Sequence, residues 1–195
     1  MVKHAIKMAL AGVALLGSMG GTAAAGGCVA PKPASDLSGP EVQAIYDCIR
    51  DSMIKGYQKG GDEVAMAYTG WKAASKLPAA PGWHGERFLM TFVNDIGYAT
   101  YTEFNDEDAK MPVGTVVAKE SFKINKKLQV KRGPLFIMTK VGDAEAPDTG
   151  GWIYGGILPN GKKMKFKQSF CHDCHGNWDT QDSLGYPLEE VRVSN

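Results

Sequence analysis

The stretch Cys171-His172-Asp173-Cys174-His175 lies near the C-terminal end of a chain of 195 residues. It carries the Cys-x-x-Cys-His pattern that attaches a c-type haem. The spacing suits that chemistry because two thiols add to the two vinyl groups of one porphyrin while the adjacent histidine reaches the iron. We therefore predict that Cys171 and Cys174 are the covalent anchors of one haem c and that His175 is the proximal iron ligand. The fold must then place a pocket beside this segment.

The same motif also fits a zinc site, a redox-active pair of cysteines or a chance match, and these alternatives stay open. A closed tetrahedral zinc site needs four convergent ligands. The histidines and thiols of the motif crowd one short turn, so zinc would have to recruit Cys28 or Cys48 from far upstream. We favour haem for this reason.

The N-terminal segment has the pattern of an export signal. Lys3 and Lys7 precede an apolar run over residues 8–16, and Ala23-Ala24-Ala25 follows as a cleavage site. The apolar run is too short to span a bilayer, and we find no other segment that is apolar enough to do so. We therefore expect no membrane span and a periplasmic location, where bacteria attach c-type haem.

These signals predict the organisation of the chain. We expect a signal peptide over 1–25 and one haem domain over 26–195, a length that suits a compact fold with a core. Lipidation at Cys28 is the alternative for the new N-terminus, although the preceding Ala25-Gly26-Gly27 lacks the usual aliphatic residue.

Cys28 and Cys48 are left over once the motif has taken two of the four cysteines. In an oxidising compartment such a pair forms a structural disulfide. We predict this bond between the N-terminal segment and the first helix, with two unpaired thiols as the alternative.

The charge balance gives no reason to expect nucleic acid as a partner. The formal net charge is +1 at pH 7, and loss of Lys3 and Lys7 with the signal leaves the charges nearly balanced. The lysines over 162–167 are either a docking face for an acidic redox partner or a solvated strand or loop.

Helical periodicity marks the first part of the mature chain. Pro40 opens an apolar stripe at helical spacing that ends near Gly56. A second helix is predicted from a cap at Asp62 to a stop at Pro78.

Beyond Gly82 the pattern changes to strands. Segments rich in Val, Ile, Phe and Thr predict strands over 87–94, 114–122, 128–141 and 152–158, with a short helix over 98–104. Turn residues at 125–127 and 159–161 predict hairpins. The expected fold class is α+β, an antiparallel β-sheet with N-terminal helices and a c-type haem attached at the C-terminal end.

The position of the motif constrains the sixth iron ligand. Twenty residues follow His175, and none of them is Met, His or Lys. The sixth ligand therefore comes from upstream or is absent. We expect an open site, at which small molecules bind and react. The upstream candidates for a ligand are His84, Met90, Met111, Met138 and Met164.

From Arg87 onward the chain resembles the cytochrome P-460 family and its relative cytochrome c'-beta. The most telling piece is Gly114-Thr115-Val116-Val117-Ala118-Lys119-Glu120, which follows Met111-Pro112-Val113. The other matching pieces are Phe92-Val93-Asn94-Asp95, Tyr98, Tyr101, Trp152 and Cys171 to His175.

The resemblance implies a mono-haem protein with an antiparallel β fold, and it suggests a homodimer. It also places Lys119 where members that oxidise hydroxylamine join a lysine nitrogen covalently to the porphyrin. The alternative is a solvent-facing lysine on an alternating strand, and cytochrome c'-beta proteins lack the link.

One departure from the family affects the mechanism. The P-460 enzymes have a distal carboxylate that relays protons, but the comparable stretch here, 135–140, contains no acid. Glu120, Glu103 or Asp143 would have to replace it. Met111 and Phe136, with Phe92, would instead form an apolar distal pocket suited to nitric oxide, although core packing explains each of them equally well.

Three functional hypotheses follow, and whether the protein is an enzyme stays open. The first is a haem oxidoreductase that oxidises hydroxylamine at an open haem face and passes electrons to a soluble partner cytochrome. The second is a cytochrome c'-beta-like protein that binds nitric oxide without turnover. The third is a simple electron-transfer cytochrome c with His84 or a methionine as sixth ligand.

Overall fold

The structure is a computed structural model that describes residues 27–193. The predicted signal peptide, 1–25, lies outside the described residues. None of the helices within residues 27–193 has both the length and the apolar character that crossing a membrane requires.

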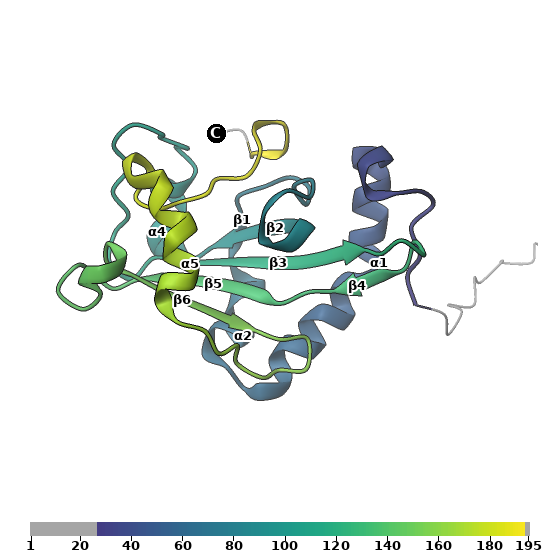
Figure 1. Ribbon diagram of the computed structural model, residues 1–195, viewed down its shortest axis with the longest axis horizontal. Helices are drawn as coiled ribbons and strands as arrows, with labels where there is room; N and C mark the ends of the chain where they lie inside the picture. The colour runs from purple at the N-terminus through teal and green to yellow at the C-terminus, as the bar shows by residue number, and fades with distance from the viewer. Residues whose placement is uncertain (1–26, 194–195) are drawn as a thin grey trace, which may run out of the picture.

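A six-stranded antiparallel sheet forms the centre of the molecule, in the order β1-β2-β3-β5-β6 with β4 paired to β3 (Figure 1). Each neighbouring pair is antiparallel, which confirms the predicted sheet and the α+β class. The strands are β1 (Lys72–Ala73), β2 (Phe88–Val93), β3 (Val116–Ile124), β4 (Val130–Arg132), β5 (Leu135–Lys140) and β6 (Trp152–Ile157).

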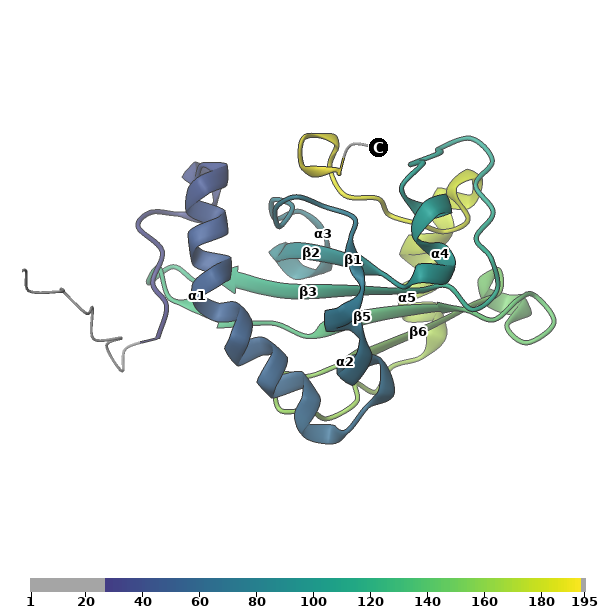
Figure 2. The same cartoon turned by 180° about the vertical axis from the view of Figure 1, so that it is seen from behind.

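Helices cover both faces of this sheet (Figures 1 and 2). The long helix α1 crosses one face, and α5 lies on the other. The helices are α1 (Gly39–Tyr57), α2 (Glu63–Ala67), α3 (Trp83–Glu86), α4 (Asp95–Tyr101) and α5 (Gln168–His175).

The sequence explains why α1 begins where it does and which side it buries. Ser38 and Glu41 form a capping box, and Pro40 fits the first turn, where its missing N–H leaves no hydrogen bond unmade. The predicted apolar stripe is buried against the sheet and forms the larger core cluster with residues such as Phe88, Phe122 and Leu135.

The predicted second helix is wrong in length. Asp62 caps α2 as expected, accepting hydrogen bonds from the backbone N–H groups of Val64 and Ala65. The helix ends at Ala67, however, and Lys72–Ala73 pairs with β2 instead. Backbone hydrogen bonds at the edge of the sheet outweigh the weak helical pattern that continues toward Pro78.

The predicted strand over 128–141 is divided into β4 and β5 by Gly133 and Pro134. Pro134 has no N–H with which to continue the ladder. The two expected turns are confirmed by the hydrogen bonds from Leu128 N–H to Asn125 O and from Gly161 N–H to Leu158 O, both 2.8 Å.

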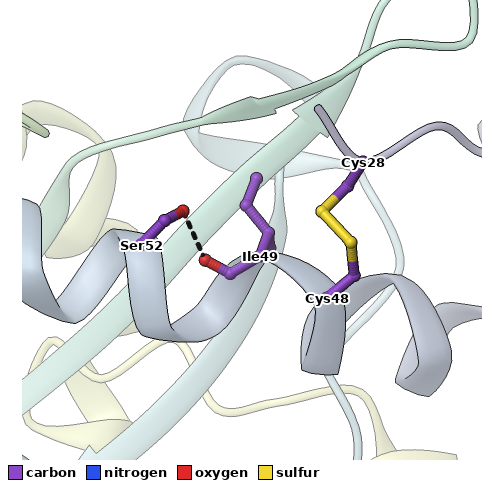
Figure 3. The surroundings of a disulfide bond; sticks show 4 residues. All are labelled: Cys28, Cys48, Ile49 and Ser52. Carbon is purple, nitrogen blue, oxygen red and sulfur yellow. Dashed lines mark hydrogen bonds between the residues drawn. A yellow bond between two sulfur atoms is a disulfide. The ribbon is translucent and has the colours of Figure 1, made fainter. Parts of the chain in front are cut away.

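A disulfide joins Cys28 to Cys48, the pair that the sequence assigns to each other (Figure 3). It ties the segment before α1 to the middle of that helix, across 20 residues of sequence. The N-terminal segment also contacts the sheet, because Ala30 N–H donates to Leu128 O at 2.8 Å. The bond therefore holds α1 and the β3–β4 end of the sheet together.

Replacing both cysteines with alanine should lower the free energy of unfolding by about 3 kcal/mol, because a loop of this length then regains its freedom in the unfolded chain. Urea unfolding of Cys28→Ala/Cys48→Ala against the oxidised wild type measures the difference. A midpoint equal to that of the wild type would show that the bond contributes nothing.

Candidate functional site

Helix α5 places the three chemically active residues of the motif on one side. Cys174 and His175 follow Cys171 by three and four residues, which is the spacing of neighbours on a helix surface. Both thiols are free, and His175 is 7% exposed. The sequence indicated the motif but not that a helix carries it.

All three residues line a cavity of about 510 Å³ between α5, the sheet and the segment around α3. This volume lies within the usual range for cofactor pockets. The lining is mainly apolar and aromatic, and it includes Trp83, Phe136, Tyr154, Phe166, Phe170 and Trp178. A second cavity of about 380 Å³ shares Trp83, His84, Lys119, His175 and Trp178 with the first.

The ring of His175 has a defined tautomer. Its Nδ1 lies 2.8 Å from the carbonyl oxygen of Ser183, and a carbonyl can only accept, so Nδ1–H donates. The other nitrogen, Nε2, therefore holds a free lone pair. Burial lowers the pKa of His175 to about 4, which keeps the ring neutral at physiological pH. A neutral imidazole with its second nitrogen hydrogen-bonded to a carbonyl is the form that binds metals.

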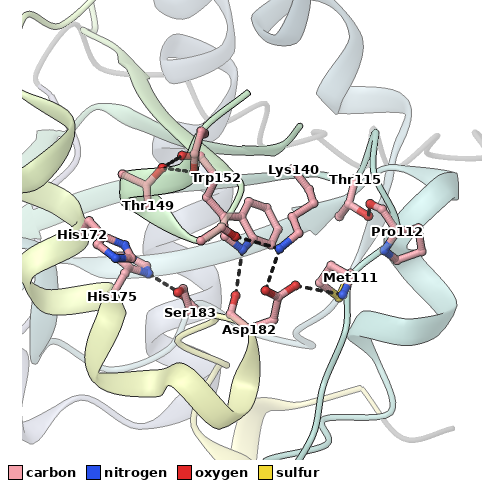
Figure 4. Close-up of polar contacts among 12 residues, drawn as sticks. Met111, Pro112, Thr115, Lys140, Thr149, Trp152, His172, His175, Asp182 and Ser183 are labelled. Carbon is pink, nitrogen blue, oxygen red and sulfur yellow. Dashed lines mark hydrogen bonds and ion pairs between the residues drawn. The ribbon is translucent and has the colours of Figure 1, made fainter. Parts of the chain in front are cut away.

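Asp182 fixes the Ser183 carbonyl in place (Figure 4). Its carboxylate pairs with Lys140 Nζ at 2.7 Å and accepts the N–H of Met111 at 2.9 Å. Its carbonyl oxygen accepts the indole N–H of Trp152 at 2.8 Å. Lys140 and Trp152 are themselves register partners on β5 and β6, so the sheet holds the loop that orients His175.

Lys119 points into the same space from the central strand β3. It is 7% exposed, and its Nζ donates to Gly185 O at 2.7 Å. The solvent-facing alternative for this lysine is therefore wrong. Burial lowers the pKa of Lys119 to about 8, so a larger fraction of the amine is neutral and nucleophilic than on a surface lysine.

His84 lies at the wall that the two cavities share. Its ring centre is 4.6 Å from that of Phe136 and 6.0 Å from that of His175. Its Nδ1 is buried and has no hydrogen-bond partner within residues 27–193. Burial lowers the pKa of His84 to about 3, so this ring is also neutral.

These residues fit a haem. Two free thiols and an imidazole with an available Nε2 line one apolar cavity, and the His84 ring lies at the same cavity. The chemistry of this donor set, two thiols and a neutral imidazole beside a largely apolar wall, suits a covalently attached porphyrin.

Of the three residues expected in the distal pocket, the structure brings only Phe136 to the cavity. Phe92 lies on the opposite face of the sheet, with its ring 5.6 Å from that of Tyr68 in the α1 core. Met111 packs in the smaller core cluster with Trp152. The prediction for Phe92 was wrong because side chains alternate along β2, and the even-numbered residues of that strand face α1.

The carboxylates considered as proton relays lie elsewhere. Glu120 faces α1, where it accepts hydrogen bonds from Tyr46 and Tyr68 at 2.6 and 2.8 Å. Neither Glu103 nor Asp143 is among the residues lining either cavity. Among the described residues that line the larger cavity, none is acidic.

Sequence reasoning missed three residues beside His175. Tyr154 and Trp178 have ring centres 5.2 and 5.7 Å from its ring. Tyr154 has a signal in the sequence, since it lies two residues after Trp152 on a strand. Ser183 acts through its backbone carbonyl, which leaves no signal in the side-chain pattern.

Comparison with known proteins adds one finding. A family model described as Cytochrome P460 matches residues 67–184. The matched region contains the whole sheet and α5 but leaves α1 outside. A search of curated proteins finds no match.

The pair of Lys140 and Asp182 should be strongly coupled, because both side chains are about nine-tenths buried. Lys140→Met or Asp182→Asn alone should each cost about 3 kcal/mol of unfolding free energy, since each leaves a buried partner unpaired. The double variant should cost clearly less than the sum. Urea unfolding of the four proteins measures the coupling.

The exposed Lys163, paired with Asp62, provides the control, and Lys163→Met should cost less than about 1 kcal/mol. Additive losses would contradict a coupled pair.

Proposed function

Because the chain belongs to the cytochrome P460 family, and is thus a haem cytochrome of that family, we propose that it is an exported mono-haem c-type cytochrome. Its proposed chemistry is oxidation or reduction of hydroxylamine or nitric oxide. A haem bound in the cavity supplies an iron that binds small nitrogen compounds and exchanges electrons with them.

The single observation that carries this proposal is the convergence of four residues on one cavity. Cys171, Cys174 and His175 come from α5, and Lys119 comes from β3, which lies far earlier in the sequence. The two thiols would hold the porphyrin through thioether bonds, each formed by adding S–H across a vinyl group. His175 would hold the iron through Nε2, because Nδ1 is occupied by Ser183.

The position of Lys119 supports the proposal that it forms the lysine–porphyrin link that the family resemblance implies. Its amine is buried, lies at the cavity and has no carboxylate partner among the described residues. Replacing the hydrogen of a ring carbon by this nitrogen removes two hydrogens in all. The link therefore needs a two-electron oxidant such as a peroxide.

The lining of the cavity disfavours a cationic ligand. Most of the lining is aromatic or aliphatic and none of the described lining residues is acidic, so a cation would lose its hydration there without gaining a counter-charge. Nitric oxide and neutral hydroxylamine satisfy this condition.

A second candidate function, nitric oxide binding without turnover, rests on the absence of an acidic residue from the described lining of the larger cavity. Oxidation of hydroxylamine releases protons, and a positioned base normally takes them. Lys119 and His84 are the cavity residues that would have to do so in an enzyme.

Export and electron transfer complete the proposal. The disulfide between Cys28 and Cys48 supports an oxidising compartment such as the periplasm. Trp83 and Phe170 line the cavity and are 64% and 73% exposed, which offers an apolar contact surface to a soluble partner cytochrome.

Lys119→Ala should return a red-shifted Soret band of the reduced protein to an ordinary position and should abolish most of the hydroxylamine oxidation, because the porphyrin link is lost. The proteins are produced with a c-haem maturation system, and the visible spectrum and the oxidation rate are measured. Lys123→Ala, at an exposed lysine on the same strand, should leave both unchanged.

An ordinary Soret position in the wild type, together with no oxidation of hydroxylamine, would contradict the enzyme. Binding of nitric oxide under those conditions would identify the second candidate function instead.

A further inference from the structure

His84 and His175 lie close together at the larger cavity. Both rings line the larger cavity, and their centres are 6.0 Å apart. An imidazole nitrogen bonds a first-row metal at about 2 Å, so two imidazoles on opposite sides of one metal have ring centres roughly 6 Å apart. A histidine that merely faced a metal-bound ligand would lie farther away, because that ligand occupies the space between.

The hydrogen bonding of His84 is incomplete. Its Nδ1 is buried without a partner among the described residues, although the ring packs against Phe136. An apolar side chain would fill this space without leaving a polar atom unsatisfied. Core packing therefore does not explain why an imidazole occupies the position.

Two of the other upstream candidates for the sixth ligand are buried away from the larger cavity. Met90 accepts a hydrogen bond from Ser75 and packs in the α1 core, and Met111 packs in the smaller cluster with Trp152. Met138 and Met164 line the larger cavity, but neither is among the residues that the two cavities share, as His84 is.

The backbone that carries His84 is strained. His84, Gly85 and Glu86 have φ values of 58°, 72° and 56°, in the left-handed region. This conformation is unfavourable for His84 and Glu86, which have a Cβ. The Arg87 guanidinium stabilises it by donating to Gly85 O at 3.1 Å. Strained conformations of this kind persist at ligand-binding sites, where the surrounding structure maintains them.

From these observations we propose that His84 binds the haem iron as the sixth ligand, opposite His175, and that an incoming small molecule must displace it. The inference rests on the proposed function, since it requires the haem that Cys171, Cys174 and His175 would hold. It replaces the expectation of an open resting site with a closed one, in which the segment 83–87 acts as a reversible gate.

Such a gate has a kinetic consequence. A ligand binds only the fraction of molecules from which His84 has dissociated, so its apparent affinity falls by that fraction. At high ligand concentration the rate of binding is limited by release of His84 and no longer rises with concentration.

The test compares the full-length haem-loaded protein with His84→Asn. Asparagine tolerates the left-handed backbone, so the change removes the imidazole and retains the local conformation. Glu86→Asn is the matched control, because Glu86 is exposed and has the same backbone conformation. Electron paramagnetic resonance of the ferric proteins reports the spin state, and rapid mixing of the ferrous proteins with carbon monoxide reports access to the iron.

We expect low-spin iron in the wild type and in Glu86→Asn, and high-spin iron in His84→Asn that excess imidazole returns to low spin. The rate of carbon monoxide binding should saturate with concentration in the wild type. In His84→Asn it should rise linearly and be at least about 10-fold faster. His84→Gly, which also relieves the strain, should behave in the same way.

High-spin iron in the wild type would overturn the proposal, and so would low-spin iron that persists in both His84 variants. The wild-type result stands even if the variants fail to load. Haem content of the denatured wild-type protein is measured first. Absence of covalent haem would overturn the proposed function and this inference together, whereas covalent haem with high-spin iron would overturn only the ligation by His84.

Discussion

The alternation of side chains along the central strand β3 is the constraint on which the rest of the structure depends. Neighbouring residues of a strand point to opposite faces, so Lys119 and Glu120 belong to different environments. Lys119 enters the cavity under α5, and Glu120 is buried beneath α1 with Tyr46 and Tyr68. A register shift of one residue would exchange them, placing a carboxylate in the cavity and a lysine in the α1 core.

This arrangement places the residues that stabilise the fold and the residues of the candidate site on opposite faces of the sheet. The α1 face contains the larger apolar core and the disulfide, whereas the α5 face contains the cavity and its few polar groups. The proximal side is made rigid from the sheet, since Lys140 and Trp152 hold Asp182, and Asp182 places the carbonyl that orients His175. The segment that carries His84 has a strained backbone, as residues at ligand-binding sites often do.

Much of this architecture could be predicted from local sequence. Strand periodicity indicated β2, β3 and β6, because these strands are long and rich in β-branched and aromatic residues. The end of α2 could not be predicted, because the pairing of Lys72–Ala73 with β2 depends on a partner much further along the chain. The split between β4 and β5 had a local signal at Gly133 and Pro134, which the continuous apolar pattern on either side concealed.

Some residues of the candidate site could likewise be predicted from the sequence, and others could not. The motif of α5 and the family resemblance indicated Cys171, Cys174, His175 and Lys119, all of which line the cavity. Phe92 and Met111 were misplaced, because hydrophobic character does not tell which face of a sheet a side chain covers. The role of Ser183 could not be predicted, because a backbone carbonyl has no sequence signature. The position of this carbonyl also depends on a buried ion pair between Lys140 and Asp182.

The proposed function requires one haem bound covalently in the cavity between α5 and β3. The most direct test is the mass of the denatured protein, produced with a c-haem maturation system, followed by digestion and identification of the haem-bearing peptides. We expect the mass of the mature chain plus one haem, with the haem on the peptide that contains Cys171 and Cys174. The mass of the polypeptide alone, or a haem attached to another peptide, would contradict it.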